Sequence, residues 1–161
     1  MSTSWRQLPA PARAIAVGVE AAVAAAQARD LAAFDEAGAE LAGLDPQQVG
    51  VVVGAVVRAL LEDLHPDGLT GDDIRGVLEQ CVRSASRWWP AVDANVIVVL
   101  LTGALGVHQF DDDAAPLSAA AMARHGAVLT ADLLAASGQP LQPYLTAVFA
   151  EIARAETVEQ P

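Results

Sequence analysis

The chain has 161 residues, of which 53% are hydrophobic and only 4% aromatic. A chain of this length is normally one domain, and its core must be built mainly from Ala, Val and Leu. The balance of 9 basic residues, all of them Arg, against 20 acidic residues gives a net charge of -11. This charge argues against nucleic acid and anionic membranes as partners, because both attract clustered positive charge.

The number of cysteines and the N-terminal residues indicate in which cellular compartment the protein is expected. Cys81 is the single cysteine of the sequence, so an internal disulfide or a thiolate metal cluster is excluded. Arg6 and Arg13 precede a small apolar stretch, as in a secretory signal, but Glu20 interrupts that stretch too early for one. We therefore expect a cytoplasmic protein that is stabilised by packing alone.

Two helices are predicted in the first 43 residues. Pro11 suits a first helical turn, and the apolar residues that follow it share one helical face. Asp30 is placed to cap a second helix that ends near Gly43. Residues 30–48 (DLAAFDEAGAELAGLDPQQ) resemble the second helix of one tetratricopeptide repeat. No further copy follows at that family's period, so the resemblance implies only a pair of antiparallel helices.

The third and fourth helices have clear start signals. Asp45 and Pro46 predict a helix running to Leu64, with Val and Leu on more than one face, which is typical of a helix surrounded by others. Gly50 and Gly54 lie four residues apart in it and would let another helix approach closely. Thr70 is placed to cap the fourth helix, whose apolar stripe is Ile74, Leu78, Cys81, Ala85 and Trp88.

The residues after Trp88 and Trp89 form the most apolar part of the chain. From Ala94 to Val107 no residue is charged. A membrane-spanning helix needs about 17–25 apolar residues, so this stretch is too short. We expect a fifth helix, bounded by Pro90, that is buried and pairs with the third helix at the centre of the domain.

Two more helices complete the predicted fold. A sixth enters near Pro116 or Ser118 and ends at Gly138, and a seventh begins at Pro140. The predicted class is an all-α single domain over residues 1–161, a bundle of about seven helices in which residues 1–10 and 156–161 are loosely ordered. An α/β fold is the alternative, because the valine runs 51–53 and 96–99 also suit buried strands.

Five residues are candidates for contact with a ligand or partner: Trp88, Trp89, Phe110, Met122 and His125. The two tryptophans either anchor one end of the core or form the wall of a pocket or the centre of a partner contact. Phe110 lies in the loop after the fifth helix. Met122 and His125 fall on the inward face of the sixth helix, where a neutral imidazole needs a hydrogen-bond partner.

Enzymatic and metal-binding patterns are weak. Cys81 lies in the middle of a helix on an apolar stripe, which is typical of a small core residue rather than a nucleophile. The loop with His65 and Asp67 and the loop with His108 and Asp111 would offer metal ligands only if they met in space. Acidic residues before helices are ordinary caps. We therefore expect no metal, no cofactor and no catalytic residue.

Three functional hypotheses follow. The first is a non-enzymatic acidic helical protein that acts by protein association, most simply as a homodimer. The second is a helical bundle that binds a small apolar ligand between Trp88, Trp89, Met122 and His125. The third is an enzyme that uses the His and Asp residues of the two loops with a metal ion.

Overall fold

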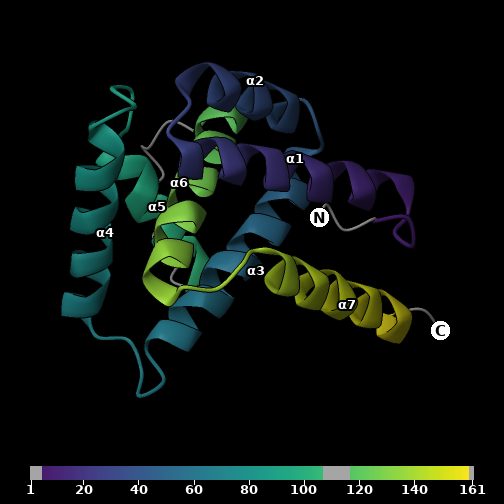
Figure 1. The fold of residues 1–161 in the computed structure, drawn as a ribbon. Coiled ribbons are helices and arrows are strands. Elements are labelled where there is room, and N and C mark those ends of the chain that lie inside the picture. Colours follow the sequence, from purple (N-terminus) through teal and green to yellow (C-terminus); the bar gives the residue numbers. More distant parts are fainter. Residues whose placement is uncertain (1–4, 107–116, 160–161) are drawn as a thin grey trace.

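The computed structural model describes residues 5–106 and 117–159, and these residues form seven α-helices and no strand (Figure 1). The helices are α1 (Ala10–Ala28), α2 (Leu31–Ala42), α3 (Pro46–Leu64), α4 (Gly71–Ser86), α5 (Ala94–Ala104), α6 (Ala119–Ser137) and α7 (Gln142–Glu159). Both valine runs are helical, in α3 and in α5. The all-α prediction is confirmed, and the α/β alternative is wrong for the described residues.

Side-chain caps explain where most of the helices begin. The N-cap side chains of α2 to α6 each accept a hydrogen bond from a backbone N–H of the first turn, and these residues are Asp30, Asp45, Thr70, Asp93 and Ser118. Such caps satisfy N–H groups that have no partner inside the helix. The predicted starts of α2, α3 and α4 are confirmed, whereas α5 begins at Ala94, four residues after the predicted boundary at Pro90, because Asp93 caps it and Pro90 lies in the preceding turn.

The central helix of the bundle is α6, which packs against α1, α2, α3, α4 and α5. Its small residues permit close packing: a Cβ atom added at Gly126 would lie 2.8 Å from Cγ1 of Val53 in α3. The expected pairing of α3 and α5 at the centre is therefore only half right. The helix α5 packs against α3, α4 and α6 but leaves an open face on which Val99 is 45% exposed. Apolar composition alone does not determine how many sides of a helix are covered.

The remaining helices form the periphery (Figure 1). The antiparallel pair expected after residue 10 is present as α1 and α2, which pack on each other and on α6. The helix α7 packs on α3, and its C-terminal half extends away from the rest of the bundle. Trp5, just before α1, is buried with its ring 6.1 Å from that of Phe149 in α7. Every helix in the described residues is too short or too polar to cross a membrane.

Candidate functional site

The two adjacent tryptophans at the end of α4 have different surroundings. Both rings stack edge-on against Phe34 of α2, with centroids 5.1 Å apart in each case. Trp89 is only 4% exposed and belongs to the core, whereas Trp88 is half-buried and reaches a surface pocket. Edge-to-face packing is a favourable arrangement of aromatic rings. One tryptophan is therefore a core anchor, and its neighbour is a pocket wall.

His125 lies against Trp89, with ring centroids 4.5 Å apart. Its Nδ1 donates to the Ala121 carbonyl over 2.7 Å, and its Nε2 accepts from the backbone N–H of Asp93 over 2.9 Å. Because Nε2 accepts a hydrogen bond, the ring is neutral with its proton on Nδ1. Burial lowers the pKa of His125, against smaller opposing effects of the Ala121 hydrogen bond and the Asp93 charge. Both nitrogens are occupied, so His125 ties α6 to the start of α5.

Met122 lines an apolar groove between α3, α5 and the start of α6. The groove encloses about 470 Å³. We call it the α3–α5 groove and define it by Gly50, Gly54, Val99, Gly103, Leu117 and Met122. It is different from the cavity that Trp88 lines, and neither contains Trp89 or His125. The four residues of the apolar-ligand hypothesis therefore do not share either of these cavities.

The glycines of the α3–α5 groove face open space. A Cβ atom added at Gly50, Gly54 or Gly103 would meet no atom of the described residues within 4 Å. Glycine in the interior of a helix is less stable than alanine by roughly 0.5–1 kcal/mol, because its backbone loses more freedom on folding. At Gly126 a close neighbour accounts for the missing side chain, but within the described chain nothing does so at these three positions.

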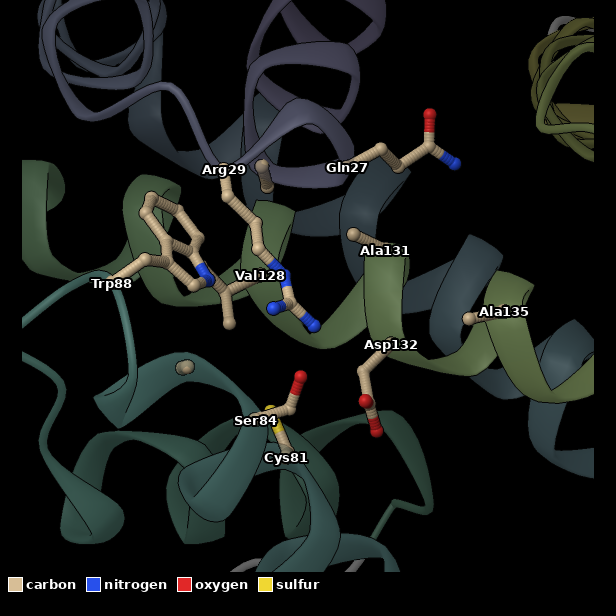
Figure 2. Close-up of a pocket in the computed structure, with 11 residues that line it drawn as sticks. Gln27, Arg29, Cys81, Ser84, Trp88, Val128, Ala131, Asp132 and Ala135 are labelled. Carbon is tan, nitrogen blue, oxygen red and sulfur yellow. The ribbon is translucent and has the colours of Figure 1, made fainter.

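A second cavity lies between the end of α1, α4 and α6 (Figure 2). It encloses about 300 Å³. We call it the Asp132 pocket, and its polar side chains are Gln27, Arg29, Ser84 and Asp132. Figure 2 shows the Arg29 guanidinium reaching toward Ser84 and Asp132. Trp88 is the one predicted contact residue that lines this pocket, whereas Arg29 and Asp132 were not predicted, although Asp132 is the one acidic residue of α6.

Cys81 lies beneath the Asp132 pocket and is fully buried. Burial, with a smaller contribution from the Asp132 charge, raises the pKa of Cys81 to about 12. The thiol is therefore protonated at neutral pH and is not a nucleophile. This agrees with the expectation of a small core residue.

The proposed metal loops are described only in part. His65 Nε2 lies 4.0 Å from Asp73 Oδ1, and its Nδ1 lies 3.2 Å from the Leu61 carbonyl. His108, Phe110 and Asp111 lie outside the described residues, and so does any meeting of the two loops. Among the residues that are described, no group of three or more His, Cys, Asp and Glu side chains is arranged to hold a metal ion.

No family model, curated protein or solved structure matches this chain. The evidence for its function therefore lies in its own surfaces. Two features of the surface are candidates for a site. One is the α3–α5 groove, which is apolar and lined by glycines, and the other is the Asp132 pocket, which is lined by a carboxyl group and a guanidinium.

Proposed function

We propose that this protein is a non-enzymatic helical module that associates with a second copy of itself through the α3–α5 groove. The observation that carries the proposal is that Gly50, Gly54 and Gly103 line one apolar groove in which no neighbour among residues 5–106 and 117–159 requires a glycine. Each costs up to about 1 kcal/mol relative to alanine in a helix. A partner side chain that approaches the backbone at these positions provides the physical reason for them.

The same surface carries apolar projections beside the hollow. Val51 is 55% exposed and lines the continuation of the hollow along α3, and Val99 is 45% exposed on the α5 wall of the groove. A two-fold symmetric interface brings the same patch of both copies together, so a projection on one copy must fit a hollow on the other. Valine side chains beside glycine gaps meet this requirement, which favours a second copy over an unrelated partner.

The extent of the surface suits a helical partner. The hollow continues along α3 past Ala55 and Ala59 to Arg58, Glu62 and, on α7, Glu151. From Pro46 to Glu62 this wall is about 25 Å long at 1.5 Å per residue. The exposed pair of Arg58 and Glu62, 3.0 Å apart, lies at its far end. An apolar centre with a polar rim is the usual composition of a protein interface.

The test compares two glycine-to-leucine variants by sedimentation velocity. Gly54→Leu fills the groove, whereas Gly76→Leu places the same side chain on an exposed face of α4 where nothing lies within 4 Å of the new Cβ. We expect dimers for the wild type and Gly76→Leu, and monomers for Gly54→Leu. Circular dichroism should show equal helix content in all of them, because a Cβ atom at either position meets no atom of the described residues within 4 Å.

Two results count against the proposal. One is a wild type that stays monomeric at every concentration up to about 1 mM, at which even a weak interface is populated. The other is a Gly54→Leu variant that dimerises as tightly as Gly76→Leu, since the groove would then lie outside the interface.

A further inference from the structure

We infer that the Asp132 pocket binds a small zwitterion, with an ammonium group of the ligand at Asp132 and a carboxylate at Arg29. This inference is independent of self-association, because the pocket is formed by α1, α4 and α6, whereas the groove is formed mainly by α3 and α5. It rests on the placement of two opposite charges around one cavity.

The charged side chains share the pocket without binding each other. Arg29 ends α1 and Asp132 lies in α6, and both side chains border the space seen in Figure 2. Among the described residues neither side chain forms a hydrogen bond or an ion pair, whereas Arg58, Arg75 and Arg124 each lie within 4.0 Å of a carboxylate. A solute with two opposite charges satisfies both groups at once, and charge-assisted hydrogen bonds are the stronger ones in proteins.

Asp132 has a specific need for a positive partner. Its carboxyl is partly buried between α4 and α6, and burial raises its pKa. The other polar or ionisable groups that line the pocket are the Gln27 amide, the Arg29 guanidinium, the Cys81 thiol and the Ser84 hydroxyl. Burying a carboxylate is unfavourable unless a cation or donor compensates it, so an ammonium group placed here stabilises the charged form.

The rest of the pocket sets the size and character of the ligand. Apolar contact comes from Ala26, Val128, Ala131 and Ala135, and Trp88 forms one wall. A volume of about 300 Å³ is at the lower end of the range for small-molecule sites, which suits a ligand of amino-acid size and excludes a nucleotide. The indole of Trp88 can pack against methylene groups or a cation.

A series of ω-amino acids tests the inference by charge separation. Glycine, 3-aminopropanoate, 4-aminobutanoate, 5-aminopentanoate and 6-aminohexanoate are titrated into the full chain by calorimetry, with butylamine and butyrate as singly charged controls. Because the ligand must reach two separate side chains at once, one chain length should bind best. We expect that length to bind at least tenfold more tightly than either control.

Three variants identify the site. Asp132→Asn and Arg29→Gln should each weaken the best zwitterion at least tenfold, whereas Arg75→Gln, on α4 but outside the pocket, should leave its affinity unchanged. Butylamine should respond only to Asp132→Asn and butyrate only to Arg29→Gln. Thermal unfolding verifies that each variant is folded. Sedimentation velocity of the same samples measures whether the oligomeric state has changed, so that a change in ligand affinity is not confused with a change in self-association.

Other outcomes overturn the inference. One is the absence of binding at about 10 mM of every zwitterion, a concentration at which even a millimolar site is occupied. Another is binding of butyrate or butylamine as tight as that of the best zwitterion. A third is an affinity that neither Asp132→Asn nor Arg29→Gln changes, which would place the ligand elsewhere.

Discussion

His125 uses both ring nitrogens in hydrogen bonds, donating to Ala121 and accepting from Asp93. The bond from the Asp93 N–H exists only while Nε2 is unprotonated. The pKa of His125 is lowered on folding, chiefly by burial. Below the ordinary histidine pKa of about 6.5, the unfolded chain therefore binds a proton that the folded chain does not, and folding is disfavoured. The stability that His125 contributes is complete above that pH and is lost progressively as the pH falls from there to the lowered pKa of the folded state.

Replacing His125 by Gln tests this role. At pH 7.5 we expect the variant to be less stable than the wild type by roughly 1–3 kcal/mol, because the amide does not reproduce both hydrogen bonds in the same geometry. At pH 5 the difference in the free energy of unfolding should be smaller, because acid destabilises the wild type by protonating His125 in the unfolded chain, whereas the variant has no histidine at this position. Urea unfolding at both pH values and one protein concentration measures the gap, and an equal gap at the two values would contradict the assignment.

At the scale of the elements, packing within the chain requires some helical glycines but not others. Gly126 lets α6 approach α3, since its missing Cβ would lie 2.8 Å from Val53. Valine is stiff at χ1 and cannot swing aside easily. Gly76 of α4 has no such neighbour and lies on an exposed face. The first glycine is required by packing within the chain, and the second is not.

Substitution by alanine should therefore have opposite effects at the two glycines. Gly126→Ala should destabilise the protein by roughly 1–3 kcal/mol through overpacking against Val53. Gly76→Ala should stabilise it by about 0.5–1 kcal/mol, since alanine is the better helix former. Chemical denaturation of both variants and the wild type measures these differences. A neutral or stabilising Gly126→Ala would mean that α3 and α6 are not in close contact there.

At the scale of the whole molecule, the net charge of -11 opposes any association of two copies. An apolar interface must overcome this repulsion, which acts over the Debye length of about 10 Å at 0.1 M salt. Salt screens the repulsion and leaves apolar burial largely intact. An interface held by ion pairs would respond in the opposite direction.

Raising NaCl from about 20 mM to about 300 mM should therefore tighten the dimer, roughly threefold or more in Kd. Sedimentation equilibrium at several salt concentrations measures the constant, with Gly54→Leu as a variant that should stay monomeric throughout. A dimer that weakens with salt would indicate attractive charges across the interface and would disfavour the α3–α5 groove as its centre.

Local signals in the sequence determined most of the helices. A cap such as Asp45 or Thr70 forms its hydrogen bonds within three residues, and helical periodicity extends over a few turns, so both can be recognised without knowledge of the rest of the chain. The burial of the face that begins at Ile15 and the end of α6 at Gly138 followed from such signals. The burial of Cys81 was predicted from the same helical periodicity.

Only the tertiary structure decided what surrounds each helix. The uncharged α5 proved to have an open face, and the alanine-rich α6 took the centre, because coverage depends on which helices pack together and not on hydrophobicity alone. Arg29 and Asp132 are about a hundred residues apart in the sequence, and no periodic pattern links residues so distant. The different roles of Gly54 and Gly126 likewise depend on the neighbour that each helix meets in space.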